Sequence, residues 1–391
     1  MAADAVIVGA GPAGSATGLL LARLGHRVTI VDKARFPRPK PCGEYLNPSA
    51  VAVLDRLGVR DVIEPLGVSL SGMWLTGMDA SVWSPFDAGR GLLIPRERLD
   101  HMLLLEAGAA GAEVIEGFRV ETVTTGPAPS VRGRHDGRPV RLDARLIVGA
   151  DGLRSVVARH RGSWRGAATG HYTLGAHFEG LASDTPRGDL HLGPGWYVGA
   201  ALYGRGRGNV VAALPQGMYA GARGRIDTLF ERVCAALPAL RRLTQRARRI
   251  GPFVAAGPLT YVRRPAVDDG LLLVGDAASA INPMTGEGIA LALRGAELAA
   301  CAADHALRSG RTDRRSLAPY ERARIEAFHS VWRMSRLLQW IVRRPRIAAP
   351  LFARLAGNPS LAARLLGVAS GVRPAGDVLS PAYLIRLLCS T

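Results

Sequence analysis

The stretch that most constrains the fold of this 391-residue chain is GAGPAG at residues 9–14. It follows a short apolar run at Ala5–Val8 and precedes residues 12–24, where leucines and alanines recur at helical spacing. A second apolar run, Val28–Val31, comes next and ends at Asp32. A strand, a glycine-rich turn, a helix and a second strand in this order are typical of dinucleotide-binding parallel sheets. We therefore expect an α/β fold whose first domain is Rossmann-like.

The glycines of this turn have separate roles in the expected fold. Gly9 permits the tight bend, Gly11 lets a pyrophosphate approach the backbone, and Gly14 lets the helix pack closely on the strand. The helix that starts here offers unpaired N–H groups and a partial positive charge to the phosphates. Asp32 stands near the spacing at which an acidic side chain holds a ribose hydroxyl. Whether the dinucleotide is FAD or NAD(P) stays open at this point. The contacts expected in this segment are Gly9, Gly11, Pro12, Ala13, Gly14, Asp32 and Lys33.

A later segment, GDAASAINPMTGEGI at residues 275–289, favours FAD. It follows the apolar run Leu271–Val274, so Asp276 is expected at the carboxyl edge of a parallel sheet, where ligands bind. A carboxylate there can accept hydrogen bonds from the ribityl polyol of a flavin, a group that nicotinamide dinucleotides lack. The glycines after Pro283 allow the N–H groups of a new helix to face the electron-accepting end of the flavin ring. The FAD contacts expected in this segment are Gly275, Asp276, Pro283, Gly286, Glu287, Gly288 and Ile289.

Three motifs together resemble those of the FAD-dependent oxidoreductases of the aromatic-hydroxylase superfamily, in sequence and in order. They are GAGPAG at 9–14, ADG at 150–152 and GDAASAINPMTGEGI at 275–289. That superfamily also includes geranylgeranyl reductases and flavin halogenases. The resemblance implies FAD as cofactor and NADPH or NADH as reductant, without a second nucleotide-binding fold. It also implies that Asp151 helps to hold FAD and that Arg96, in the segment IPRERLD, reaches the cofactor.

The loop PRPKPCGE at residues 37–44 resembles the P-x-x-K-x-C-G-E loop of the geranylgeranyl-reductase branch. The aromatic strand usual in that branch is only partly present, because residues 195–204 read GWYVGAALYG and lack its Phe-Pro. Cys42 is a candidate catalytic thiol on the substrate side, with basic residues of the loop to stabilise a thiolate, or else a small loop side chain. Glu44 is a candidate catalytic acid or base, or else a cap of the loop.

These motifs leave three functions open, of which we expect the first. In a monooxygenase, NAD(P)H reduces the flavin, oxygen adds at its C4a atom, and the C4a-hydroperoxyflavin oxidises an aromatic or polyketide-like molecule of secondary metabolism. In a reductase of the geranylgeranyl type, reduced flavin gives hydride to a prenyl double bond and Cys42 or water supplies the proton. In a non-catalytic carrier of prenyl lipids, Asp276 would have no purpose.

Aromatic residues in the middle of the chain are candidates for substrate contact. Trp74, Trp196 and Tyr197 lie in expected strands, and their rings can pack on a flat or isoprenoid molecule or belong to the core. Alternation along its strand directs His177 toward the same side, although a lone histidine is more often structural.

Hydrophobic patterns divide the chain into a discontinuous FAD-binding domain, a β-sheet substrate domain and a C-terminal helical region. The arginine-rich helices of the last region either cover the substrate domain or lie on an anionic membrane. The three regions are expected at residues 1–70, 90–165 and 257–310; at residues 71–89 and 166–256; and at residues 311–391.

Composition narrows the choice of partners beyond a small-molecule substrate. The formal net charge is +18, yet basic and aromatic residues do not alternate as in RNA-binding surfaces, so no nucleic-acid partner is expected. Four widely spaced cysteines predict neither disulfides nor a zinc site, and no metal site is expected. The N-terminus passes directly into a strand and no apolar run reaches membrane-spanning length, so we expect a cytoplasmic protein. The oligomeric state stays open.

Overall fold

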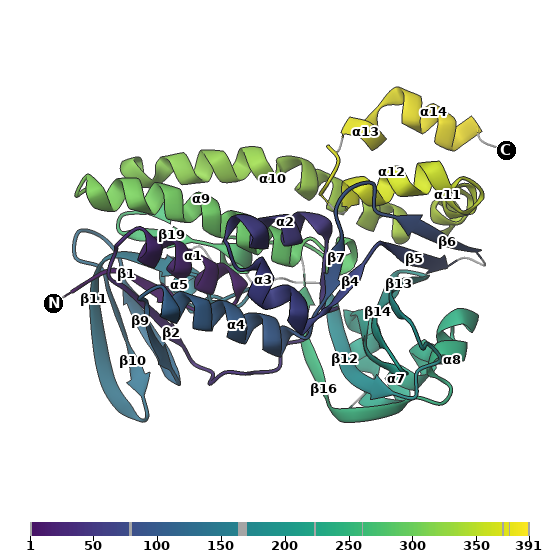
Figure 1. The fold of residues 1–391 in the computed structure, drawn as a ribbon, viewed down its shortest axis with the longest axis horizontal. Helices are drawn as coiled ribbons and strands as arrows, with labels where there is room; N and C mark the ends of the chain where they lie inside the picture. Colours follow the sequence, from purple (N-terminus) through teal and green to yellow (C-terminus); the bar gives the residue numbers. More distant parts are fainter. Residues whose placement is uncertain are drawn as a thin grey trace.

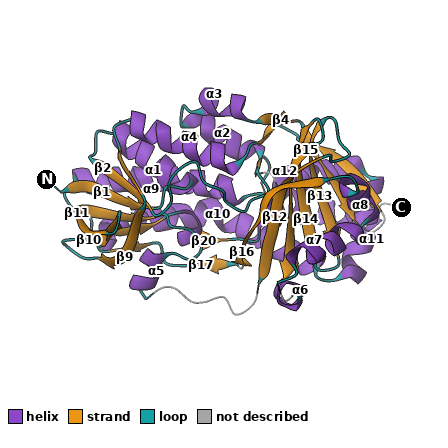
Figure 2. Ribbon diagram, turned by 90° about the horizontal axis from the view of Figure 1, so that it is seen from below, coloured by secondary structure: helices purple, strands orange, loops and turns teal. Residues whose placement is uncertain are grey.

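The structure is a computed structural model that describes residues 2–77, 80–162, 170–222, 224–259, 261–369, 371–374 and 376–389. Two large β-sheets follow one another along the long axis of the molecule, and the chain termini lie toward its opposite ends (Figures 1 and 2). The expected α/β fold, with a parallel sheet, a second sheet and C-terminal helices, is confirmed.

Five strands of the first sheet run parallel, in the order β19–β11–β1–β2–β8. The apolar runs of β1, β2 and β19 and the last residues of β11 are buried, as expected for the inner strands of a parallel sheet, whereas the edge strand β8 is only partly buried. Helix α1 packs against both α4 and α9 on this sheet. The elements are β1 (Ala3–Val8), α1 (Pro12–Arg23), β2 (Val28–Asp32), α4 (Arg96–Ala109), β8 (Glu113–Glu116), β11 (Arg138–Gly149), β19 (Leu271–Leu273) and α9 (Gly288–Arg308).

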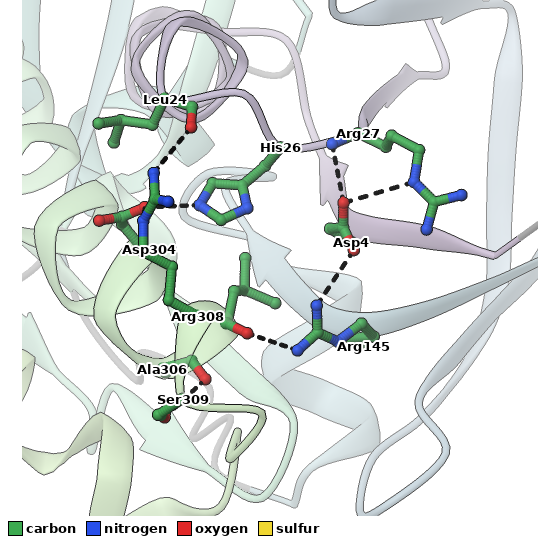
Figure 3. A network of polar contacts seen from close by, with 10 residues as sticks. Asp4, Leu24, His26, Arg27, Arg145, Asp304, Ala306, Arg308 and Ser309 are labelled. Carbon is green, nitrogen blue, oxygen red and sulfur yellow. Dashed lines mark hydrogen bonds and ion pairs between the residues drawn. The ribbon is translucent and has the colours of Figure 1, made fainter.

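A polar network holds the C-terminal end of α9 against this sheet (Figure 3). Asp304 contacts His26 Nε2 at 2.7 Å and accepts a hydrogen bond from Arg308 Nε at 2.6 Å. Arg145 donates to the carbonyl of Leu307 and to Asp4, which also accepts from the backbone N–H of Arg27. The network ties the C-terminal end of α9 to β1, to β11 and to the residues just before β2, and so helps to fix this helix.

Among the described residues, the second sheet has seven strands in the order β16–β12–β15–β14–β13–β5–β6, and of these only β13 and β5 pair in parallel. One face buries a hydrophobic cluster against α7 (Ile226–Ala235) and α8 (Pro238–Thr244). The alternation of its strands therefore leaves the other face free to line a cavity. The strands are β5 (Gly72–Gly77), β6 (Ala80–Pro85), β12 (His171–Glu179), β13 (Pro186–Gly193), β14 (Trp196–Gly204), β15 (Arg207–Pro215) and β16 (Arg248–Leu259).

The C-terminal helices cross from the first sheet to the second. Helix α10 (Arg314–Val342) packs on α9, and α11 and α12 pack on β6 (Figure 1). In the part of the chain that the structure describes, no helix is long and apolar enough to span a bilayer. The remaining helices of this region are α11 (Pro345–Gly357), α12 (Pro359–Ala369), α13 (Gly376–Leu379) and α14 (Pro381–Cys389).

Short elements connect these layers. They are β3 (Tyr45–Leu46), α2 (Pro48–Arg56), α3 (Arg60–Ile63), η1 (Glu64–Leu66), β4 (Val68–Leu70), β7 (Gly91–Leu93), β9 (Phe118–Thr124), β10 (Ser130–His135), α5 (Val156–His160), α6 (Gln216–Gly221), β17 (Val262–Arg263), β18 (Val267–Asp268), η2 (Gly275–Ala277), β20 (Ser279–Ala280) and η3 (Pro283–Thr285).

Candidate active site

The carboxyl edge of the parallel sheet opens into a cavity of about 1050 Å³. Because β1, β11 and β19 run parallel with Val8, Gly149 and Leu273 in register, the segments that follow these strands meet at this edge. These segments are the glycine turn, the ADG motif and the GDA segment, and all three line the cavity. Motifs separated by most of the chain therefore form one wall.

The three glycines of the first turn meet different surroundings. Gly9 has φ +103°, and a Cβ there would lie 2.5 Å from the carbonyl oxygen of Ala150. A Cβ on Gly14 would lie 1.8 Å from the carbonyl oxygen of Gly9. At Gly11 the nearest atom would be Arg38 Nη2 at 3.7 Å, and Gly11 lines the cavity. Packing thus requires glycine at positions 9 and 14, whereas at position 11 the missing side chain leaves room for a ligand.

Asp32 ends β2 and stabilises the same turn. Its carboxylate accepts hydrogen bonds from the backbone N–H groups of Ala10 and Ala34, each at 2.8 Å. A carboxylate has further lone pairs, so Asp32 can still accept from a ribose hydroxyl. Pro12, Ala13 and Lys33 line the cavity beside it.

Two further carboxylates border the cavity. Asp151 accepts from the N–H of Val156 at 2.6 Å, and its buried Oδ1 has no partner. The pKa of Asp151 is raised by burial. Asp276 exposes its side chain toward the cavity. Surrounding protein raises its pKa by desolvation, and the positive charge of Lys40 is the largest effect opposing that rise.

The turn at residues 282–289 also borders the cavity. Asn282 Oδ1 accepts from the N–H of Met284 at 3.1 Å and from the Tyr197 hydroxyl at 2.6 Å, which fixes the turn to the second sheet. Gly286 adopts the left-handed conformation with φ +69°, and a Cβ there would lie 2.8 Å from the Tyr45 ring. Gly288 begins α9, and a Cβ on it would meet no atom within 4 Å. Pro283, Gly286, Gly288 and Ile289 all line the cavity, as do Gly275 and Asp276.

Glu287 departs from this group. Its side chain is buried, is not part of the cavity lining, and faces a separate cavity of about 310 Å³ beside Gly371. Burial raises the pKa of Glu287 to about 8, and its Oε1 has no partner. The neighbouring residues of the turn border the main cavity, whereas the carboxyl group of Glu287 points to the smaller one. A contact between Glu287 and FAD, predicted from the sequence, would therefore have to come from its backbone.

Arg96 and the loop of residues 38–42 form a charged corner of the cavity. Arg96 Nε and Nη2 donate to the two oxygens of Asp100 at 2.8 Å each, and Arg38 Nη2 lies 3.2 Å from the same carboxylate. Burial alone would lower the pKa of Arg96, but Asp100 and Cys42 outweigh it and the pKa is raised. A permanent buried cation thus lies beside Cys42, and both line the cavity.

Glu44 joins the same loop to the second sheet. It is buried with φ +54°, and its Oε1 accepts from the N–H of Arg96 at 3.2 Å. Its Oε2 contacts His177 Nε2 at 3.0 Å and accepts from the Tyr203 hydroxyl. The hydrogen bond with Glu44 raises the pKa of His177. Of the two roles left open for Glu44, this geometry favours the structural one, since Glu44 is not part of the cavity lining.

On the substrate side, alternation along the strands separates the three candidate aromatic residues. Tyr197 lines the cavity. Trp196 instead belongs to the hydrophobic cluster on the other face of the sheet, and Trp74 packs on Trp83 with ring centroids 5.8 Å apart. The structure therefore does not place Trp74 and Trp196 at the cavity, because each adjoins a lining residue in a period-two strand.

The cavity continues from the flavin-side wall beneath the C-terminal helices. From the sequence, these helices were expected either to cover the substrate domain or to lie on a membrane, and none of their residues was predicted to line a cavity. The leucines and phenylalanines at helical spacing in these helices could have indicated such lining residues. The lining residues in this part are Leu75, Leu190, Val211, Leu338, Ile341, Ala348, Leu351, Phe352, Leu355, Tyr383 and Leu387.

The lining residues fit FAD. Gly11 and Gly288 both leave room that a Cβ would fill, and they lie at the N-termini of α1 and α9. Helix N-termini favour the pyrophosphate and the electron-rich end of a flavin ring. The unpartnered Oδ1 of Asp151 and the cavity-facing carboxylate of Asp276 are acceptors that the ligand's hydroxyl groups can satisfy. In the described part of the chain, no three His, Cys, Asp or Glu side chains are grouped to hold a metal ion.

Comparison with known proteins agrees with this geometry. Residues 2–335 match the family model described as FAD binding domain. The chain is 32% identical to the menaquinone reductase of Mycolicibacterium smegmatis, over 93% of this chain and 91% of that protein. It is 27% identical to digeranylgeranylglycerophospholipid reductase 1 of Methanothermobacter thermautotrophicus, over 82% of this chain and 81% of that protein.

Solved structures show the same fold. A geranylgeranyl bacteriochlorophyll reductase-like protein from Thermoplasma acidophilum is 22% identical and superposes with a TM-score of 0.84, covering 99% of this chain and 98% of that chain. The flavin-dependent halogenase CmlS is 24% identical with a TM-score of 0.76, covering 84% of this chain and 63% of that chain. At such identities these two likenesses establish the fold alone.

Proposed function

The chain belongs to the FAD binding domain family, in the geranylgeranyl-reductase-like branch of the FAD-dependent oxidoreductases, and from this premise we infer that it reduces a carbon–carbon double bond of an isoprenoid lipid. The observation that carries the proposal is the apolar extension of the cavity, which runs from the FAD-side wall to Leu387. A long apolar passage suits a flexible hydrocarbon chain better than a small polar aromatic molecule.

The names of the relatives point in the same direction. The two sequence relatives described above are called reductases of menaquinone and of a digeranylgeranyl lipid. We therefore prefer reduction to the monooxygenase chemistry that the sequence favoured, and NAD(P)H remains the proposed reductant.

In this proposal, bound FAD supplies the hydride once it has been reduced. The Gly9–Gly14 turn and the N-terminus of α1 would hold the pyrophosphate, and Asp32 and Asp276 would hold hydroxyl groups of the cofactor. The N-terminus of α9 would stabilise negative charge at the flavin ring. The apolar wall excludes water from the double bond.

Cys42 is the proposed proton source. It lies at the cavity wall where the FAD-side segments meet the second sheet, and its backbone carbonyl accepts from Asn209 Nδ2 at 2.7 Å, which fixes its position. The Cys42 thiol would donate its proton to the carbon next to the one that receives hydride. The guanidinium of Arg96 would then stabilise the negative charge left on the sulfur.

Anaerobic turnover tests the proposal. Purified protein with FAD and NADPH is given a geranylgeranyl lipid without oxygen, and the product is weighed by mass spectrometry. We expect product heavier by two hydrogen atoms per reduced bond. A product heavier by one oxygen atom, formed only in air, would establish the monooxygenase instead. A colourless protein that binds the lipid unchanged would indicate the carrier.

A Cys42→Ala variant tests whether Cys42 is the proton donor. Loss of a general acid typically slows the reaction by about 10²-fold or more, so we expect that loss in the turnover rate with unchanged FAD content. Cys42→Ser is the conservative control and should recover part of the rate. If Cys42→Ala turns over at the wild-type rate, water supplies the proton.

A further inference from the structure

We propose that the surface around the turn from α10 to α11 docks on an anionic lipid bilayer, and that the cavity receives its lipid chain there. This port surface is defined by Arg336, Leu337, Trp340, Arg343, Arg344, Arg346 and Ile347. The proposal rests on the proposed function for the nature of the lipid, but the docking itself can be measured separately.

The port surface exposes large apolar side chains together. Leu337, Trp340 and Ile347 are 38%, 47% and 37% exposed. No residue from 336 to 347 is buried, although the preceding part of α10 packs on α9 through buried residues such as Tyr320 and Phe328. Single exposed apolar side chains are common on protein surfaces, but several close together in the chain indicate an interaction site.

The charge of this region points to an anionic partner. Residues 327–376 contain eight arginines and no aspartate or glutamate. Arg343, Arg344 and Arg346 are exposed at the turn itself. The Arg344 guanidinium lies 4.1 Å from the centroid of the Trp340 ring and donates to the Trp340 carbonyl. Tryptophan with flanking arginine is typical of the headgroup region of a bilayer, where the ring is half buried and the cations meet lipid phosphates.

The same turns also line the cavity. Leu337 is both exposed and part of the lining, and Leu338, Ile341 and Val342 continue the lining inward. On helix α14, Leu384 is likewise exposed and part of the lining. The cavity lining therefore reaches the surface at the end of α10, beside the basic and apolar side chains, and also at α14. A hydrocarbon chain leaving a bilayer at this port would enter the apolar passage without crossing water.

Co-sedimentation with vesicles tests the docking. The FAD-loaded protein is mixed with vesicles of phosphatidylglycerol and phosphatidylcholine in equal parts, or of phosphatidylcholine alone. We expect binding to the anionic vesicles that salt weakens, because salt screens exposed charges. The double variants Trp340→Ser/Ile347→Ser and Arg343→Glu/Arg346→Glu should each bind at least about tenfold more weakly, since each basic residue near an anionic surface contributes about fivefold.

Matched controls lie elsewhere on the surface. Leu105→Ser/Met218→Ser removes two exposed apolar side chains from α4 and α6, and Arg241→Glu/Arg242→Glu reverses two exposed charges on α8. These variants should bind the vesicles like the wild type. Equal weakening of vesicle binding by the port and control variants would overturn the proposed surface.

A second readout separates this proposal from the proposed function. With a geranylgeranyl lipid dissolved in detergent micelles, the port variants should keep wild-type turnover, and with the same lipid in anionic vesicles they should be slower by the same factor as their binding. If the wild type turns over the lipid in detergent but does not bind the vesicles, the proposed docking surface is wrong and the proposed reductase activity still holds. Vesicle binding without any turnover overturns the reductase and leaves the docking surface intact.

Discussion

Two glycines three residues apart are required for different reasons. A Cβ on Gly14 would overlap the carbonyl oxygen of Gly9, whereas a Cβ on Gly11 would enter the cavity. Only a substitution at Gly11 therefore tests whether the ligand binds at this turn.

The pair Gly11→Ala and Gly14→Ala tests this difference. We expect the Gly11 variant, freed of cofactor, to melt at the temperature of the wild-type apoprotein but to bind FAD at least about tenfold more weakly, because the methyl group takes the place of the phosphate. The Gly14 variant should lose about 1–3 kcal/mol of stability from overpacking. Thermal denaturation measures the stability of each variant, and visible absorbance measures its bound FAD. If Gly11→Ala binds FAD as tightly as the wild type, the pyrophosphate does not bind at this turn.

Glu287 should make stability depend on pH. Its folded-state pKa of about 8 lies above the ordinary value of 4.5, because burial disfavours the charged form. The stability it contributes is therefore fully present below pH 4.5 and is lost as pH rises to about 8. Tyr45 faces Glu287, and burial raises the pKa of Tyr45, so Tyr45 stays neutral in this window. Asn47, beside both, is uncharged. Arg373 lines the same smaller cavity and stays charged over the whole window.

Glu287→Gln isolates this effect, because glutamine keeps the shape and cannot ionise. We expect the melting temperature of the wild type to fall relative to that of the variant between pH 5 and pH 8. Parallel melting curves over this range would show that Glu287 titrates normally, with solvent reaching it through the smaller cavity.

At the scale of elements, β14 shows how one strand serves two surfaces. Trp196 and Val198 face the buried cluster, whereas Tyr197 and Gly199 line the cavity. A Cβ on Gly199 would meet no atom within 4 Å, so this glycine widens the passage and does not relieve packing.

A phenylalanine at position 199 should therefore fill the passage. For Gly199→Phe we expect KM for a long isoprenoid lipid to rise by about tenfold or more, with unchanged FAD content, because the ring occupies space that the chain needs. Gly217→Phe, in open space on α6, is the control. An unchanged KM would place the lipid outside this face of the sheet.

At the scale of the whole molecule, the cavity lies between elements of all three regions of the chain. Its lining draws on the parallel sheet, on the second sheet and on α10, α11 and α14. FAD bound there would stabilise a structure that these regions build together.

Removal of FAD tests this coupling. A ligand at 100 times its Kd adds about 2.7 kcal/mol to the free energy of unfolding, so the melting temperature should rise by several degrees on FAD addition. We expect one calorimetric transition that moves as a whole. If only part of the heat absorption shifts, the second sheet unfolds independently of the FAD-binding part.

Local sequence determined the parallel sheet and the FAD-side wall. Apolar runs, glycine turns and helical spacing act over a few residues, and parallel strands necessarily bring their carboxyl ends to one edge. This is why the sequence alone could place Gly9, Gly11, Asp32, Asp276 and Gly288 at the edge of the sheet where the cavity lies.

Only the tertiary structure decided the rest. The contact of Glu44 with His177, and not with the cavity, joins residues that are 133 positions apart in the sequence. Whether Trp196 or Tyr197 faces the cavity depends on which side of the sheet α7 and α8 cover. The apolar passage exists because α10 to α14 pack over a sheet formed much earlier in the chain, and packing between distant segments leaves no signal in the short spacings from which local structure is read.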